Sequence, residues 1–548
     1  MTALYPQYAS ATSVSTPADC KPAEPNQAQQ FEANGSAETS PDLIWMVDGV
    51  KGGAPAIGTI TNTGLYTAPA NMDEAVNVTI TAVSAKDDTE LANIKVCNAV
   101  YSRAGATYFV ATTGADSNAG TQSAPWRTIQ HAVDQVQAGD TIIVRGGIYN
   151  ETVTINKSGS VEKGFITLEK YSGENAIIDG TGLATQPTGM RGLISLNNAS
   201  YIRIKGFEIR NYKSATEFIA IGILAQGSGE RIEIRNTTIH AIEANNLPAN
   251  GNANALGIAV YGQTATPIRN VIIDGNELFD LKTGTSESLT VGGNIDGWQI
   301  TNNLVHDNNF IGIDATGYYN NPAEYNRARN GWIAGNTVYN LSTAGNQALT
   351  FAAAAIGIYV DGGRDITIER NDVFANDGGI WLLSEQPGKA TENIIARNNI
   401  IRLNRDAGIL AGGYDATGSG GIANTTITGN TLSQNNTRDV AGIHAGEFQI
   451  GHNVKNIKFG SNRLSAGSKG YVITKFAPAE AGSVTLSDNI YYTLSGSELT
   501  RWFWSDTNYY NDGSTANDFS AFKAISGDSG SVVNNPETVQ TPQAQPAP

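Results

Sequence analysis

An asparagine recurs at one position of a short strand–turn–strand unit and constrains the fold of this chain more than any other feature. The unit reads DGNELF, TNNLVH, AGNTVY, ERNDVF, ARNNII, TGNTLS, GSNRLS and SDNIYY. Its separations run from 27 residues to 35 residues, and the aligned positions are Asn276, Asn303, Asn336, Asn371, Asn398, Asn430, Asn462 and Asn489. Short repeats with loops of unequal length are typical of stacked coils, whereas a compact globular domain does not repeat in this way.

The segments before these asparagines alternate aliphatic and polar residues, as in IRIKGFEI and IEIRNTTI. This alternation predicts strands that are stacked over a narrow core. An asparagine at each bend tolerates a left-handed backbone and can hydrogen-bond to its copy one coil away. We therefore assign the asparagines to the scaffold and give them no catalytic role.

Residues 1–101 show a different pattern, in which short β-type runs alternate with turns as in a β-sandwich. The stretch from Trp45 through VDGVKGGAPAIGTITNTGLYTAPA resembles bacterial immunoglobulin-like domains, which recur in exported, surface-associated proteins. The two cysteines, Cys20 and Cys97, stand near the start and end of this segment. We expect a disulfide between them, with two separate thiols as the alternative.

Residues 106–164 contain the tract APWRTIQHAVDQVQAGDTIIVRGGIY. Its apolar residues Ile129, Ala132, Val133 and Val136 fall at helical spacing, and Thr128 stands near the start, which predicts one short amphipathic helix followed by strands. The tract resembles the N-terminal cap of parallel β-helix proteins. Residues 165–495 hold the coils.

Residues 496–535 contain an aromatic strand and a Phe-x-x-Phe segment before Gly527, Asp528, Gly530 and Ser531. This order resembles the closing segment of polysaccharide-acting β-helix proteins, although it departs by one residue from their Gly-x-Asp-x-x-Ser pattern. Residues 536–548 are rich in Pro and Gln, and we expect a disordered tail there.

The cap, the coils and the closing segment together resemble the secreted right-handed parallel β-helix family, which includes pectate-lyase-like enzymes, uronan epimerases and phage tailspike depolymerases. The resemblance implies an all-β chain, a right-handed parallel β-helix solenoid preceded by an immunoglobulin-like β-sandwich. It also implies a secreted or cell-surface protein, with a phage particle as the alternative. The fold alone does not fix the activity, because one scaffold carries many functions.

A second strand of each coil begins with a Gly-Ile-like pair, as in GIAVYG, GIDATG, GIYVDG, GIWLLS and GIHAGE. If the isoleucine faces the core, the third and fifth residues face outward. The expected outward stripe contains Tyr261, Asp314, Tyr359, Asp361, Trp381 and His444. We predict that the aromatics are exposed and that the two aspartates face solvent on adjacent coils, which lie ~5 Å apart.

Two carboxylates this close can share a proton, bind one cation or bracket a glycosidic bond. Our candidate catalytic residues are Asp314 and Asp361, with Glu385 from the following loop in reserve. Asp377 joins the two aspartates in a candidate Ca²⁺ site, and Tyr261, Tyr359, Trp381 and His444 are candidates for binding glycan. The alternative is that the carboxylates only solubilise a sheet face and the aromatics stack in ladders.

The formal net charge of −16, with no run of Lys and Arg among aromatics, argues against a nucleic-acid partner. The resemblance to the β-helix family implies a polysaccharide as the partner. The start MTALYPQYAS has no leader pattern, and we expect neither a signal peptide in the chain as given nor membrane insertion. A homo-oligomer through β-helix or sandwich surfaces stays open.

Three functions stay open at this point. A glycoside hydrolase needs two carboxylates, which the outward stripe supplies. A uronate lyase needs a base beside a carboxylate that cations neutralise, and Lys475 is the only basic residue that we place on the stripe. A non-catalytic adhesin or structural surface protein could use the same stripe to bind glycan.

Overall fold

The computed structural model describes most of residues 105–534 and several segments before them. Within 105–534 the residues not described are 161–162, 184–187, 215–216, 245–252, 320, 322, 350–353, 438–444, 468–470, 477–482, 493–501, 505–508 and 512–518. Before residue 105 the described segments are 14–15, 28–33, 43–47, 50–54, 57–61, 63–69, 77–84 and 90–97.

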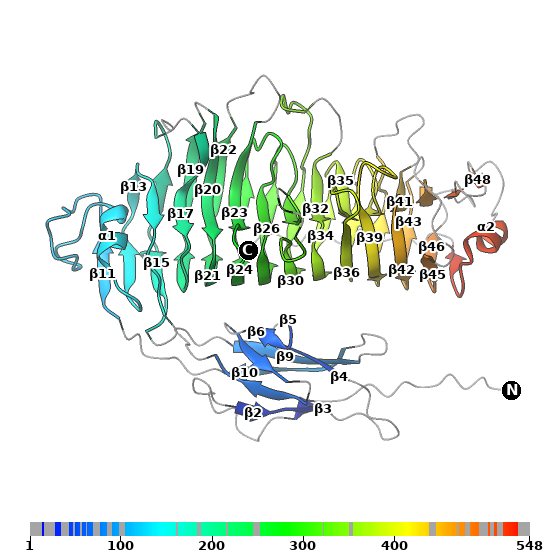
Figure 1. The fold of residues 1–548 in the computed structure, drawn as a ribbon, viewed down its shortest axis with the longest axis horizontal. Coiled ribbons are helices and arrows are strands. Elements are labelled where there is room, and N and C mark those ends of the chain that lie inside the picture. The colour runs from blue at the N-terminus through cyan, green and yellow to red at the C-terminus, as the bar shows by residue number, and fades with distance from the viewer. Residues whose placement is uncertain are drawn as a thin grey trace.

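Three parallel sheets of 13 strands each wind into one right-handed parallel β-helix, which confirms the predicted solenoid (Figure 1). Successive strands of the chain pass from one sheet to the next, and each strand pairs with the equivalent strand one coil later. Only the final pair of the third sheet, β47 with β48, is antiparallel. All side chains on one face of a sheet therefore form columns along the β-helix axis.

The strands of each sheet have the following bounds. The first sheet contains β11 (Thr107–Val110), β12 (Thr141–Val144), β15 (Ile166–Lys170), β18 (Ile202–Lys205), β21 (Gly229–Arg235), β24 (Ile268–Asp274), β27 (Ile295–Thr301), β30 (Arg329–Ala334), β33 (Arg364–Glu369), β36 (Ala390–Arg397), β39 (Gly421–Thr428), β42 (Val454–Gly460) and β45 (Val484–Ser487). The second contains β13 (Gly147–Tyr149), β16 (Ala176–Asp179), β19 (Glu208–Lys213), β22 (Thr238–Glu243), β25 (Glu277–Phe279), β28 (Leu304–His306), β31 (Thr337–Tyr339), β34 (Asp372–Phe374), β37 (Ile400–Arg402), β40 (Thr431–Ser433), β43 (Arg463–Ser465), β46 (Ile490–Tyr492) and β49 (Val532–Asn534). The third contains β14 (Val153–Ile155), β17 (Thr188–Asn197), β20 (Glu217–Gly227), β23 (Ala255–Gly262), β26 (Leu289–Gly293), β29 (Ile313–Thr316), β32 (Ile356–Asp361), β35 (Gly378–Leu383), β38 (Ile409–Ala411), β41 (Gly446–Ile450), β44 (Tyr471–Lys475), β47 (Trp502–Trp504) and β48 (Tyr509–Asn511).

Inward residues of all three sheets form one continuous apolar core along the β-helix. In the third sheet, for example, Ile313, Ile358 and Ile380 occupy one register position of successive coils and are fully buried. Burial of such aliphatic side chains contributes about 1.5–3 kcal/mol each. Each coil alone is too thin to enclose a core, so the stacking itself creates it.

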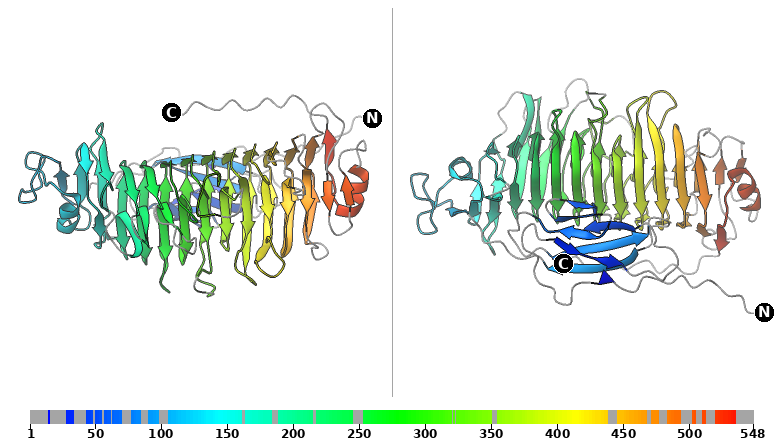
Figure 2. Two further views of the ribbon diagram at one scale, coloured as in Figure 1. Left: turned by 90° about the horizontal axis from the view of Figure 1, so that it is seen from above. Right: turned by 60° about the horizontal axis from the view of Figure 1, so that its bottom comes forward.

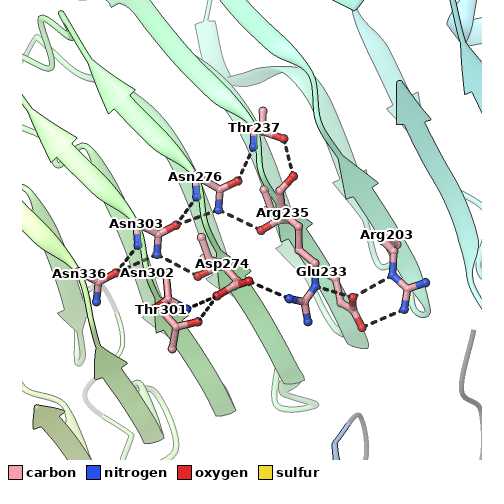
Figure 3. Close-up of polar contacts among 12 residues, drawn as sticks. Arg203, Glu233, Arg235, Thr237, Asp274, Asn276, Thr301, Asn302, Asn303 and Asn336 are labelled. Atoms are coloured by element: carbon pink, nitrogen blue, oxygen red, sulfur yellow. Dashed lines mark hydrogen bonds and ion pairs between the residues drawn. The ribbon is translucent and has the colours of Figure 1, made fainter. Parts of the chain in front are cut away.

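A buried asparagine ladder runs along the turn between the first and second sheets (Figure 3). The backbone N–H and Nδ2 of Asn303 both donate to Oδ1 of Asn336, at 2.9 and 3.0 Å. The same pair of bonds repeats along Asn276, Asn303, Asn336, Asn371, Asn399, Asn430, Asn462 and Asn489. The sequence alignment was therefore wrong in one coil, because Asn399 occupies the ladder and Asn398 holds the preceding left-handed position at φ 55°.

A second ladder, which the sequence analysis missed, follows the turn between the second and third sheets. Here Asn376 donates to Asn404 through its backbone N–H, and Asn404 donates to Asn435 through N–H and Nδ2. The ladder ends where both groups of Asn435 donate to the buried carboxyl of Glu447. Two ladders at two turns satisfy buried polar groups in every coil that carries them.

The N-terminal segments form two four-stranded antiparallel sheets, ordered β10-β9-β4-β5 and β2-β8-β7-β6, beside a pair of β1 (Val14–Ser15) and β3 (Glu32–Ala33). Their strands are β2 (Ala28–Gln30), β4 (Leu43–Val47), β5 (Val50–Lys51), β6 (Gly53–Ala54), β7 (Gly58–Ile60), β8 (Leu65–Thr67), β9 (Asn77–Ser84) and β10 (Glu90–Cys97). Phe31, Trp45 and Tyr66 share one buried cluster. The immunoglobulin-like assignment stays a prediction. Cys20 and the side chain of Cys97 lie outside the described residues, so the disulfide also stays a prediction.

The N-terminal sheets lie along the outer face of the first sheet of the β-helix, as both views show (Figures 1 and 2). A cavity of about 610 Å³ remains between them and is lined by Met46 and Val50 on one side and by Ile272, Gln299 and Trp332 on the other. The outer face of the third sheet does not line this cavity.

Each end of the β-helix carries one helix. The predicted N-terminal helix is present as α1 (Ile129–Gln135), whose Thr128 hydroxyl accepts the N–H of His131, and its residues Ile129, Ala132 and Val133 are buried. At the other end, α2 (Phe519–Ser526) packs Phe522 against Trp502 with ring centroids 4.1 Å apart. The tail 536–548 lies outside the described residues. Among the described residues, no helix has the length and apolar character needed to cross a bilayer.

Candidate functional site

The outer face of the third sheet carries the predicted acidic residues. One column of this face runs through Thr290, Asp314, Tyr359 and Trp381 on β26, β29, β32 and β35. Asp361 lies two residues beyond Tyr359 on the same strand, so Asp314 and Asp361 occupy adjacent coils as predicted. The alternation that buries Ile313 and Ala315 in the core turns Asp314 to the opposite face.

The predicted exposure of this face is wrong. Asp314 is 2% exposed, Asp361 is 1% exposed and Tyr359 is 4% exposed, while Tyr261 and Trp381 are half-buried. Apolar residues of the third-sheet strands and of the turn before β29 form a separate cluster on this face, which contains Phe310, Ile311, Ile356, Tyr359, Leu383 and Leu410 and packs against Trp381. The aspartates are therefore held in a low-dielectric pocket rather than on an open surface.

Tyr319 bridges Asp361 and Glu385, and Tyr359 contacts Glu385 alone. The hydroxyl of Tyr319 lies 2.6 Å from Oδ2 of Asp361 and 2.8 Å from Oε2 of Glu385. The hydroxyl of Tyr359 donates to Oε1 of Glu385 at 3.1 Å. The backbone N–H of Glu385 donates to Oδ1 of Asp361 at 2.7 Å. These four contacts place the two carboxyl groups side by side.

The loop that carries Tyr319 is fixed by a buried arginine. Arg327 is fully buried and donates to the carbonyl oxygens of Gly362, Gly363 and Ala390 and to the carboxylate of Glu392, all within 2.9 Å. The guanidinium also lies over the ring of Tyr318, at 4.9 Å. Because Arg327 joins three coils, the position of Tyr319 is set by the scaffold.

Burial and mutual repulsion raise the pKa values of the acids. Burial raises the pKa of Asp361 to about 8, and the charge of Glu385 adds to this effect. Burial, followed by Glu287, Asp361 and Glu385, raises the pKa of Asp314 well above its usual range. The pKa of Glu287 rises to about 7, again through burial and then Glu385. Glu287, Asp314, Asp361 and Glu385 therefore form one acid cluster, which cannot be fully ionised at neutral pH.

Glu287 is a member that the sequence analysis missed. It precedes β26, a strand that has no Gly-Ile start and was not recognised, although Leu289 and Val291 alternate in its sequence. The missed strand also moves Tyr261 one coil further from the aspartates than predicted, because Tyr261 pairs with Gly292, which lies beside Thr316.

Asp377 has different surroundings from those predicted. Both side-chain oxygens of Asp377 are engaged, one by Arg405 and the other by Thr343 and the N–H of Ala355, so Asp377 does not join the acid cluster. His444 lies outside the described residues. The strand of its coil is β41, in which Phe448 pairs with Ile409, so the predicted register was wrong and Gln449 occupies the outward column.

Lys475 was also placed one residue out of register. Thr474 is the outward residue of β44, and the ammonium of Lys475 lies over the ring of Trp504, at 4.6 Å. Lys389, a basic residue of the loop after β35, forms an ion pair with Glu324 at 2.8 Å.

Several buried polar atoms of the column have no hydrogen-bond partner within the described part of the chain. They include Oδ1 of Asp314, Nε1 of Trp381, Oε1 of Gln449 and Oγ1 of Thr474. Because an unpaired buried polar atom costs about 1–3 kcal/mol, such atoms usually meet water or a ligand. In the same described residues, no group of three or more His, Cys, Asp and Glu side chains is arranged to hold a metal ion.

Comparisons with known proteins agree with the fold. The family described as the Pel9A-like right-handed β-helix region matches residues 108–321, and the family described as periplasmic copper-binding protein NosD matches residues 324–444. The chain is 35% identical over 431 residues to the uncharacterized protein YwoF of Bacillus subtilis, covering 78% of this chain and 87% of YwoF.

Two further similarities cover less. The chain is 38% identical over 113 residues to the pectate lyase PEL9 of Emericella nidulans, which covers 19% of this chain and 27% of PEL9. A solved lacto-N-biosidase of Eubacterium ramulus is 15% identical, covers 70% of this chain and 63% of that chain, and has a TM-score of 0.44.

Proposed function

The chain belongs to the pectate-lyase-like right-handed β-helix proteins, and on that premise we propose that it is an extracytoplasmic glycan-cleaving enzyme of the glycoside hydrolase type. The observation that carries the proposal is the pair of hydrogen-bonded carboxyl groups on Asp361 and Glu385, one of which is buried with a pKa of about 8. The match to the family described as periplasmic copper-binding protein NosD and the similarity to a pectate lyase support a location outside the cytoplasm.

The chemistry follows from the different surroundings of the two groups. Hydrolysis of a glycosidic bond needs one carboxylic acid that protonates the leaving oxygen and one carboxylate that acts as base or nucleophile. Asp361, whose pKa burial raises to about 8, supplies the acid. Glu385 receives a hydrogen bond from Tyr359, is half-buried and supplies the carboxylate. Asp314 remains a candidate for the same chemistry from the adjacent coil.

The electrostatics favour a glycan whose reacting sugar is uncharged. The acid cluster would repel a uronate unless a cation intervened. Two cationic side chains of the loops, Lys389 and Arg327, are held by Glu324 and Glu392, and Arg327 also by backbone carbonyls. The half-exposed Tyr319 and the exposed Tyr414 offer ring surface to a sugar.

A calcium-dependent lyase is the second candidate, because the chain resembles a pectate lyase over 113 residues. In that function Asp314 and Asp361 would supply carboxylate oxygens to Ca²⁺, which prefers such ligands. Asp377 is not available as the third ligand, since Arg405 holds it. The ion would neutralise the substrate carboxylate and lower the charge of the acid cluster.

The two candidates are separated by one experiment. The full chain is incubated with a panel of neutral and uronate polysaccharides, with and without a chelator, while reducing ends and the absorbance of unsaturated products are measured. Reducing ends without unsaturation, insensitive to the chelator, support the hydrolase. Unsaturated products that the chelator abolishes support the lyase. Binding without either product overturns both and supports an adhesin.

A further inference from the structure

We propose that Tyr319 holds one shared proton between Asp361 and Glu385, so that this pair carries a single negative charge in the resting protein. The inference deepens the proposed function by identifying a positioning residue for its acid and base. Only the catalytic use of the shared proton depends on the proposed function. The protonation state itself follows from the contacts.

The argument begins with a count of hydrogens. The phenol oxygen of Tyr319 lies within 2.8 Å of one oxygen of each carboxyl group. A tyrosine hydroxyl has one hydrogen and can donate it to only one of these oxygens. If both carboxyls were ionised, the other contact would bring two oxygens together with no hydrogen between them.

The remaining oxygens do not supply that hydrogen. Oδ1 of Asp361 already accepts the N–H of Glu385, and Oε1 of Glu385 already accepts the hydroxyl of Tyr359. The second contact of Tyr319 is a hydrogen bond only if a carboxyl oxygen carries a proton and donates it to the phenol. The hydroxyl hydrogens of Tyr319 and Tyr359, the N–H of Glu385 and one added proton then satisfy all four contacts.

Burial indicates where the proton rests. Asp361 is 1% exposed, whereas Glu385 is half-buried and receives the hydroxyl of Tyr359. Asp361 therefore donates to the phenol oxygen of Tyr319, and Tyr319 donates to Glu385. In this arrangement Glu385 accepts two hydrogen bonds, one from Tyr319 and one from Tyr359.

The groups around the pair act in the same direction. The other acids facing Asp361 and Glu385 are Glu287 before β26 and Asp314 on β29, and the tyrosines around them are Tyr261, Tyr359 and Tyr414. The nearby cations Lys389 and Arg327 are bound to Glu324 and Glu392. Both uncompensated negative charge and burial disfavour a second charge on the pair.

Tyr319, which contacts both Asp361 and Glu385, also provides a path for the proton. When the O–H bond of Asp361 breaks and the phenol oxygen gains that hydrogen, the phenol can pass its own hydrogen to Glu385. The phenol is neutral before and after, and only the assignment of acid and carboxylate has changed. Tyr319 thereby lets the two residues exchange the roles that hydrolysis requires of them.

The test is an infrared pH titration of the substrate-free full chain. The difference spectrum between wild type and Asp361→Asn isolates the carboxylic-acid C=O band of Asp361. We expect this band in wild type at neutral pH. In Tyr319→Phe we expect the upper midpoint of its titration to fall by about one pH unit or more, because the bridge no longer favours the singly charged pair.

The matched control is Tyr325→Phe on the same loop, whose hydroxyl contacts Asn321 rather than an acid. This variant keeps the wild-type titration if the proposal is correct. Absence of the band in wild type at neutral pH overturns the proposal, as does an unchanged midpoint in Tyr319→Phe. Because the titration needs no substrate, a protein that cleaves no glycan but shows the band and its shift contradicts the proposed function and leaves the shared proton in place.

Discussion

The first and third sheets of this β-helix bury carboxylates to the same degree and give them opposite properties. Glu233 on β21 is 4% exposed and Asp361 on β32 is 1% exposed. Burial alone would raise the pKa of Glu233, but Arg203 and Arg235 outweigh it and lower that pKa to about 2 (Figure 3). Asp361 has acids as neighbours, and burial raises its pKa to about 8.

The comparison shows that the scaffold does not decide the charge of a buried acid. Both residues project from the outer face of a parallel sheet of the same solenoid. On the first sheet, Arg203 one coil away and Arg235 two residues away compensate Glu233, and a further ion pair joins Arg235 to Asp274. The third sheet concentrates acids and hydroxyls. The first arrangement lowers the pKa of its buried acid, and the second raises it, which is the kind of perturbation that marks a candidate functional site.

The largest expected effect is on turnover. Asp361→Asn removes the acid and should lower kcat by about 10²–10⁴-fold on the glycan that the panel identifies. Glu233→Gln should leave turnover per folded molecule unchanged. Steady-state kinetics on both variants test this difference, and full activity in Asp361→Asn would show that the acid is another member of the cluster.

The next largest expected effect is on stability, and here the first sheet matters more than the third. Glu233→Gln leaves Arg203 and Arg235 without their shared partner and should lower the free energy of unfolding by about 3 kcal/mol. Lys282→Met serves as the control, since Lys282 is more than half exposed and its ion pair with Glu243 should contribute less than about 1 kcal/mol. Urea denaturation at neutral pH measures both values. Equal losses in the two variants would mean that burial does not strengthen the ion pairs of Glu233 with Arg203 and Arg235.

The pH dependence of stability should also differ in sign. The pKa of Asp361 is raised from 3.8 to about 8, so its protonation stabilises the fold below pH ~4 and this contribution is lost as pH rises toward 8. The pKa of Glu233 is lowered from 4.5 to about 2, so its contribution is present above pH ~4.5 and is lost as pH falls toward 2. Asp361→Asn should therefore be more stable than wild type at pH 8, by on the order of 1 kcal/mol per unit of pKa shift, and equal to it near pH 4. Thermal unfolding of Asp361→Asn and wild type between pH 4 and pH 8 shows which of the two proteins is more stable at each pH.

A smaller effect separates the two asparagines of one coil. Asn399→Ala removes the acceptor for both donors of Asn371 and should lower the free energy of unfolding by about 2 kcal/mol. Asn398→Gly keeps the left-handed position and should change stability by less than about 0.5 kcal/mol. If the two variants lose equal stability, the ladder register is wrong in this coil.

The sequence predicted the ladder because each Asn precedes a short apolar strand, and that strand fixes the register to within one residue. Where two asparagines adjoin, at 398 and 399, the letters alone do not show which one turns inward. The third sheet was harder to predict. Its β26 and β41 lack the Gly-Ile start, so the stripe omitted Glu287 and misplaced the coil of His444.

The site itself was predicted in part. Strand alternation placed Asp314 and Asp361 on one face of adjacent coils. It could not show that loops and turns cover that face, because Tyr319 reaches Asp361 from 42 residues earlier and Arg327 holds its loop through contacts in other coils. Burial, and with it the raised pKa values, depends on these long-range contacts rather than on the local pattern.

The smallest effect tests whether the outer rim of the acid cluster binds sugar. Tyr414 is 63% exposed, and its pKa is raised by burial and then by the charges of Glu385 and Asp361, so it lies near the pair. A ring at this position can stack on a sugar at the mouth of the site. Tyr414→Ala should weaken glycan binding by about 1 kcal/mol, roughly fivefold in Kd, with stability and kcat close to wild type.

Trp381→Ala, in contrast, removes a ring that packs on the apolar cluster over the third sheet and should lower both the affinity for glycan and the free energy of unfolding. Calorimetric titration with the glycan, together with thermal unfolding of both variants, measures the two quantities. Unchanged affinity in Tyr414→Ala and in Trp381→Ala would mean that substrate does not cross this face, and the contrast between the two sheets would then concern stability alone.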